Sequence, residues 1–149
     1  MPLLIALKLI HVLSVIVAVG ANVSYVFWLR LAGRDRDRIV FAIAGIRWLD
    51  RRVANPLYVL VLVTGILMVT NGLYSFETGW IATALILYVL VVVVGIALFA
   101  PAIRRQLAEA ERDPASPGYA AAAARSTALA GATTLVVLVI VYLMVTKPF

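Results

Sequence analysis

Four long apolar segments dominate this chain, and they limit what it can fold into. They run from about residue 3 to 31, 53 to 70, 80 to 100 and 127 to 146. A helix needs about 20 mostly apolar residues to cross a bilayer. Within lipid, every backbone N–H and C=O group must be bonded inside the protein, so such segments cross as α-helices. The sequence therefore predicts an all-α integral membrane protein, a four-helix bundle forming one transmembrane domain over residues 1–149.

The composition agrees with this interpretation. The chain is 64% hydrophobic and 13% charged, whereas soluble domains are about 45–50% apolar and about 25% charged. A soluble domain of this length could not hide so much apolar surface, so the expected solvent is lipid. The absence of cysteine excludes disulfides, thiolate metal ligands, iron–sulfur clusters and cysteine nucleophiles.

The first apolar segment is expected to be a retained helix and not a cleaved signal peptide. It lacks a positively charged beginning, it is too long, and it carries Lys8 and His11 in its interior.

The arginines predict the orientation in the membrane. Eleven of the 13 lysines and arginines fall in two connections, residues 30–52 and 104–125, while the loop of residues 71–79 has none and carries Glu77. The positive-inside rule places the connections of about 32–52 and 101–126 in the cytoplasm, with both termini on the outer side. This topology also explains the net charge of +6, so we expect the lipid bilayer as partner and no nucleic acid.

Both cytoplasmic connections are expected to be partly helical. Ile39, Ile43 and Ile46 recur at helical spacing, which fits either an interfacial helix or an extension of the second span. Proline at position 56 fits the first turn of a helix. After Pro101 the second connection continues as a helix until residues 113–118 break it.

Ionisable groups inside a membrane are costly and mark functional sites. Apart from Arg30, with which the first arginine-rich connection begins, only Lys8 and His11 fall within the expected spans, which contain no aspartate or glutamate. That absence disfavours a proton-coupled transporter and a carboxylate-bridged metal site. On a helical wheel at about 100° per residue, His11, Ala18 and Asn22 share one side of the first helix, which we expect to face the bundle.

His11 is the candidate ligand for a haem iron, since imidazole is a common axial ligand and methionine a known partner. The other candidate cofactor-binding residues at a similar outer depth are Lys8, Met68, Met144 and Tyr88. The alternative is that His11 only hydrogen-bonds to a neighbouring hydroxyl or carbonyl group. A single histidine cannot supply two axial imidazoles within one chain, so a bis-histidine haem b requires a dimer.

Other features indicate helix packing and not chemistry. Thr127, Ala130, Gly131 and Thr134 form a small-residue surface suited to close helix contact. The tryptophans are typical interfacial anchors. No phosphate-binding loop, nucleophile–histidine–acid set or carboxylate pair is present.

Two ends of the chain carry a family resemblance. Leu7-Lys8-Leu9-Ile10-His11-Val12-Leu13 and Tyr142-Leu143-Met144-Val145-Thr146-Lys147-Pro148 resemble the first helix and the ending of a bacterial family of four-helix integral membrane proteins of unknown function. The lysine three residues before a histidine is also similar to the first helix of HemJ-type proteins of haem synthesis and of CopD-type copper-resistance domains. The HemJ-type resemblance implies haem binding and protoporphyrinogen oxidation by His11, although the second histidine and the lysine expected in a later span are absent.

The sequence thus predicts a multi-pass protein of a bacterial plasma membrane. The leading hypothesis for its function is a non-enzymatic bundle, acting as an accessory subunit of other membrane proteins or as a homo-oligomer. The alternative is a haem-b binding redox protein or HemJ-like protoporphyrinogen oxidase that uses His11.

The predicted orientation can be tested with reporter fusions. A periplasm-active reporter fused after residue 149 is expected to be active, and the same reporter inserted in the first arginine-rich connection is expected to be silent. A cytoplasmic C-terminus would refute the predicted topology.

Overall fold

The computed structural model describes residues 2–148, and the regular secondary structure of this part of the chain is helical throughout, without β-strands. The first helix is α1 (Pro2–Ala32), and the last is α6 (Pro117–Thr146). Between them, α2 (Arg36–Leu49), η1 (Asp50–Ala54) and α3 (Asn55–Thr70) form one continuous helix, as do α4 (Gly79–Val94), η2 (Gly95–Phe99) and α5 (Ala100–Arg112). These four long helices are each long and apolar enough to cross a membrane, which confirms the expected fold class.

The continuity of the second helix answers a question that the sequence left open. Residues 39–52 are not a separate interfacial helix, because α2 runs through η1 into α3. Because α2 and α5 extend the helices beyond the apolar segments, the turns between the helices at the arginine-rich end are short. Each ends in an N-cap, where Asp35 accepts from the Arg38 N–H at 2.9 Å and Ser116 accepts from the Tyr119 N–H at 3.1 Å.

A π-helical segment precedes a proline in each of the two continuous helices. Pro56 follows η1 and Pro101 follows η2. Proline lacks an N–H group and its ring clashes with the carbonyl four residues earlier, which in both cases belongs to the π-helical segment. The wider turn relieves that clash, so each helix continues past its proline.

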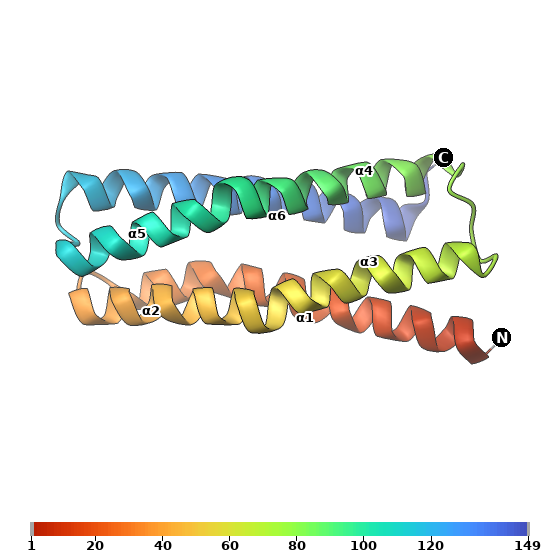
Figure 1. Cartoon of the computed structure of the whole chain (residues 1–149), viewed down its shortest axis with the longest axis horizontal. Coiled ribbons are helices and arrows are strands. Elements are labelled where there is room, and N and C mark those ends of the chain that lie inside the picture. The colour runs from red at the N-terminus through yellow and green to blue at the C-terminus, as the bar shows by residue number, and fades with distance from the viewer. Residues whose placement is uncertain (1, 149) are drawn as a thin grey trace.

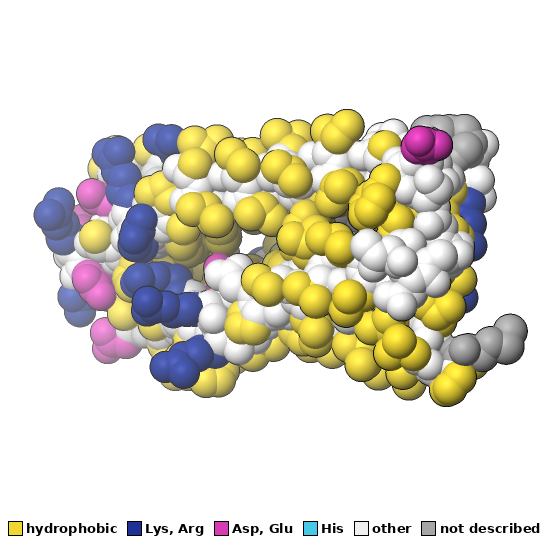
Figure 2. All heavy atoms as spheres, turned by 45° about the vertical axis from the view of Figure 1, so that its right-hand side comes forward, with side chains coloured by type: hydrophobic (Ala, Val, Ile, Leu, Met, Phe, Trp, Pro, Cys, Tyr) yellow, Lys and Arg dark blue, Asp and Glu magenta, His cyan; other side chains and the backbone are white. Residues whose placement is uncertain are grey.

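The helices are arranged as two pairs that lie along each other (Figure 1). One pair is α1 with α3, and the other is α4 with α6. Within the described residues, no Cα atom of α3 comes within 8 Å of one in α4 or α6. The space-filling view shows a hollow between the two pairs near the middle of the molecule (Figure 2).

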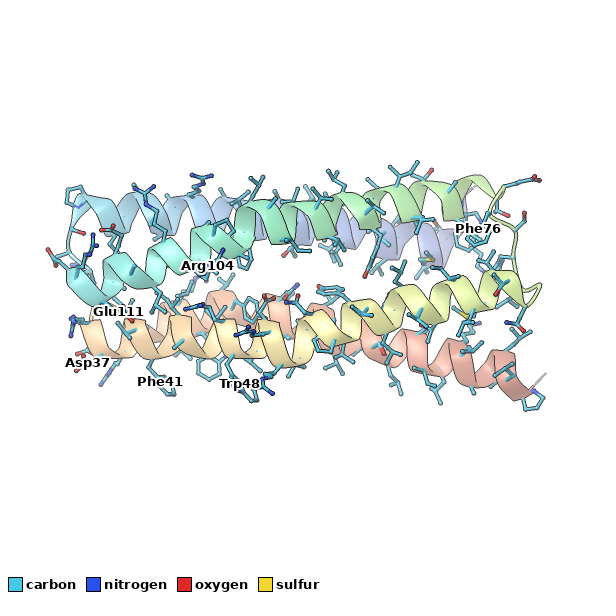
Figure 3. The ribbon with its side chains drawn as sticks, in the orientation of Figure 1. Asp37, Phe41, Trp48, Phe76, Arg104 and Glu111 are labelled. Carbon is cyan, nitrogen blue, oxygen red and sulfur yellow. The ribbon has the colours of Figure 1, made fainter. Side chains whose placement is uncertain are left out.

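The two pairs meet at the arginine-rich end, where α2 packs against α5. A hydrophobic core forms there around Ile43, which is completely buried, together with Ile39, Ile103 and Ala110. Arg36 adds a hydrogen bond from its Nε to the Glu111 carbonyl oxygen at 3.1 Å. On the outer side of α2, Phe41 and Trp48 are exposed, and the Phe41 ring lies 6.4 Å from that of Trp28 on α1 (Figure 3), as suits interfacial anchors.

Candidate functional site

His11 lies in the seam between α1 and α3. Its Nδ1 atom is 3.0 Å from the Val61 carbonyl oxygen and 3.0 Å from the Thr64 Oγ1. The Thr64 hydroxyl itself donates to the Leu60 carbonyl oxygen at 2.7 Å. Gly65 faces the same ring, since a Cβ atom there would lie in contact with His11 Cε1 at 3.4 Å. The histidine thus joins α1 to α3 within the membrane.

These contacts identify the protonated nitrogen of the His11 ring. A carbonyl oxygen only accepts hydrogen bonds, so Nδ1 must carry the proton that it shares with Val61. In the uncharged ring this leaves the lone pair of Nε2 free. Histidines that ligate metals usually have this arrangement, with the other ring N–H donated to a carbonyl or carboxylate group. The seam therefore combines the hydrogen-bonding role expected for His11 with a nitrogen that can still bind an iron.

The structure brings only some of the other candidates to this seam. Met68 is buried on α3, one turn beyond Thr64. Lys8 is exposed on α1, outside the buried stripe of that helix. Met144 belongs to α6, in the other helix pair, and is 37% exposed. Met68 is thus the methionine on the helix that His11 contacts.

Tyr88 contributes to a different layer of the bundle. Its hydroxyl donates to the Tyr58 carbonyl oxygen at 2.7 Å, which connects α4 to α3 across the gap between the helix pairs. The Tyr58 hydroxyl accepts from the Asn22 side-chain amide of α1 at 2.5 Å. Tyr58 lies six residues before Thr64, or about 9 Å along the helix axis. The sequence analysis placed Tyr88 at a depth in the membrane similar to that of His11. In the structure Tyr88 lies closer to the arginine-rich end.

Two buried polar atoms in this layer, the Asn22 Oδ1 and the Tyr25 Oη, have no hydrogen-bond partner among residues 2–148. Buried polar groups normally have a partner, so these atoms mark a place where water or a polar group of a ligand can bind. The η1 segment that carries Asp50 packs against α1, the helix that carries Asn22 and Tyr25.

Asp50 is the functional candidate that the sequence analysis did not include. It was assigned to the connection before the second span, but it lies in η1 and is only partly exposed. The signal that could have revealed it is its position one to two turns before Pro56 in a helix that continues through the proline.

The comparison with protein families agrees with the fold and with the resemblance of the two chain ends. The model of a family described as "Predicted integral membrane protein (DUF2269)" matches residues 5–148. The chain belongs to this family. A DUF2269 protein is a multi-pass membrane protein of unknown function, which confirms the expected membrane class and the resemblance to an uncharacterised four-helix family. No curated protein and no solved structure matches the chain.

The hydrogen bond of Tyr88 can be tested by its removal. Tyr88→Phe keeps the ring but loses the hydroxyl that reaches the Tyr58 carbonyl oxygen. We expect a loss of about 0.6 kcal/mol in unfolding free energy, with about 1.7 kcal/mol as the upper bound for such bonds in membranes. The measurement is unfolding in mixed micelles. Tyr142→Phe is the matched control, since Tyr142 is 59% exposed; equal losses in both variants would contradict the assigned role.

Proposed function

We propose that this DUF2269 protein is a non-enzymatic membrane subunit that works as a homo-oligomer in a bacterial plasma membrane, with its arginine-rich end in the cytoplasm. The observation that carries this proposal is the incomplete burial of its helices. In the most apolar stretches of the first two long helices 17% of the residues are buried, and in the last two 11%. A helix packed in a bundle usually buries a stripe of about three residues in seven. The helix faces of one chain therefore leave room for a second protein.

The α6 helix offers the surface best suited to a second copy. Thr127, Gly131 and Thr134 follow each other at spacings of four and three residues, so they share one face of the helix. A Cβ atom added at Gly131 would have no atom within 4 Å, and Thr127 is exposed. Because Thr127 and Gly131 are exposed while Thr134 is only half-buried, this small-residue face can take part in the close backbone approach by which helices associate in lipid.

A symmetric dimer is the simplest assembly of this kind. In a twofold interface the same surface of each copy meets its counterpart, so α6 would pack against α6 near Gly131. This arrangement requires no rearrangement of the chain. The alternative within the same hypothesis, a different membrane protein in place of the second copy, is distinguished by the experiment below.

The absence of cysteine from the sequence makes the dimer testable by disulfide formation. Gly131→Cys is expected to give a covalent dimer when native membranes are oxidised, because near the twofold axis the two thiols come within bonding distance. Gly20→Cys on α1 is the matched control, since a Cβ atom there also has no atom within 4 Å. Non-reducing electrophoresis measures the product. A Gly131→Cys variant that remains monomeric, or that is trapped only with another protein, would refute the homo-oligomer.

The geometry of His11 favours a second candidate function, the binding of haem b. The ring is fixed by its Nδ1 contact with Val61, and its Nε2 lone pair is available. When bound, a haem supplies reversible one-electron chemistry. Two residues of this chain would hold the haem. His11 would be the iron ligand, and Met68, four residues after Thr64 on α3, would be the sulfur ligand.

An absorption spectrum tests this second candidate. Protein purified in detergent from haem-sufficient cells is expected to show a Soret band that shifts on reduction with dithionite and disappears in His11→Ala. Gly65→Leu is a second test that retains the histidine, because its side chain would displace the imidazole that lies 3.4 Å from the Cβ position. A featureless spectrum of the unmodified protein would refute haem binding. The role of His11 would then be its structural contact with α3.

A further inference from the structure

A groove between α5 and α6 lies at the arginine-rich end of the molecule. It has a volume of about 200 Å³ and is lined by Pro101, Ala102, Arg105, Ala122 and Arg125. The two alanines are small and buried, so they open the groove between the helices. Two arginines, one from each helix, border this apolar floor. The groove thus combines apolar surface with two positive charges.

The packing beneath the groove fixes the spacing of these arginines. Gln106 and Ser126, the residues next to Arg105 and Arg125 in the sequence, are almost completely buried. The Ser126 hydroxyl donates to the Gln106 side-chain oxygen across the two helices. This hydrogen bond ties α5 to α6 at the turn from which both arginines extend. The pair of guanidinium groups is therefore a feature of the helix packing and not of a flexible loop.

Neither arginine is neutralised by another residue of the described part of the chain. Among residues 2–148, no carboxylate oxygen lies within 4 Å of the guanidinium group of Arg105 or Arg125, whereas Arg112 pairs with Glu109 and Arg36 with Asp37. Both arginines are also exposed. Arginine binds phosphate groups through a planar pair of N–H donors. The missing partner of the groove is thus an anion, most suitably a phosphate.

The position of the groove along the helices indicates where this phosphate comes from. Arg105 follows the end of the third apolar segment at about residue 100, and Arg125 precedes the start of the fourth at about residue 127. Both therefore lie where the hydrocarbon region gives way to the head groups. Basic pockets between helices on the cytoplasmic side bind the head groups of anionic lipids. Figure 2 shows basic side chains gathered at this end of the molecule, and the arginines of both connections lie there.

We propose that the α5–α6 groove is a binding site for one anionic phospholipid of the cytoplasmic leaflet. Arg105 and Arg125 hold its phosphate, and the apolar floor of Ala102 and Ala122 receives the first part of its acyl chains. The site depends on the topology proposed above, but it depends neither on the α6 dimer nor on haem at His11. A phospholipid bound in this groove links α5 to α6 from the membrane side.

The test measures the binding of fluorescent phosphatidylglycerol in detergent micelles, with fluorescent phosphatidylcholine as the neutral probe. We expect tighter binding of phosphatidylglycerol, and about fivefold weaker binding after either Arg105→Ala or Arg125→Ala. Arg104→Ala is the matched control, since Arg104 is an exposed neighbour on α5 that does not line the groove (Figure 3). Arg105→Lys keeps the charge and is expected to retain part of the affinity.

Four results would overturn the proposal. Equal binding of both lipids would exclude a phosphate site for anionic lipid. An Arg104→Ala variant as weak as Arg105→Ala would mean that the whole basic surface attracts the lipid without a defined groove. Efficient displacement of phosphatidylglycerol by inorganic phosphate would show that the groove takes the free anion. Phosphatidylglycerol affinity unchanged by both groove substitutions, in variants with native helix content by circular dichroism, would place the lipid elsewhere.

Discussion

The absence of water inside a bilayer is the constraint on which the rest of this structure depends. Each backbone donor and acceptor within the lipid must find its partner in the chain, and this requirement makes all four apolar segments helical. The two prolines show how strictly it applies. At Pro56 and Pro101 a helix in water could simply end, but here η1 and η2 widen the preceding turn and the helix continues.

The same constraint explains why the two helix pairs are held together so differently along their length. Inside lipid the hydrophobic effect does not drive helices together, so association depends on close packing and polar contacts. In the membrane the pairs are linked by the hydrogen bond from Tyr88 to the Tyr58 carbonyl. Beyond the apolar segments, where water is present, Ile43 and Ile103 share a conventional hydrophobic core. The arginine-rich end therefore fixes the arrangement of the helix pairs, and the hollow between them remains (Figure 2).

At the opposite end of the molecule, Lys147 contacts two aromatic side chains. The Lys147 Nζ donates to the Tyr74 hydroxyl at 2.8 Å and lies 4.9 Å from the centre of the Tyr74 ring, which packs edge-on against Trp80. These contacts connect the end of α6 to the loop between α3 and α4. Such cation–aromatic contacts suit the membrane interface, where a side chain has an apolar and an aqueous neighbour at once.

The sequence by itself determined the properties that follow from short stretches of residues. Segment length and hydropathy predicted four helices, and the 3.6-residue period correctly placed Ala18 on the buried side of α1, because both depend only on local geometry. The tertiary structure decided which helices meet. It alone shows that His11 contacts Val61 and Thr64, that Tyr88 belongs with Tyr58, and that Asp50 lies in a segment packed against α1. In a uniformly apolar helix many faces can bury equally well, so the choice of neighbours is made by packing between distant segments, which a pattern along one segment does not encode.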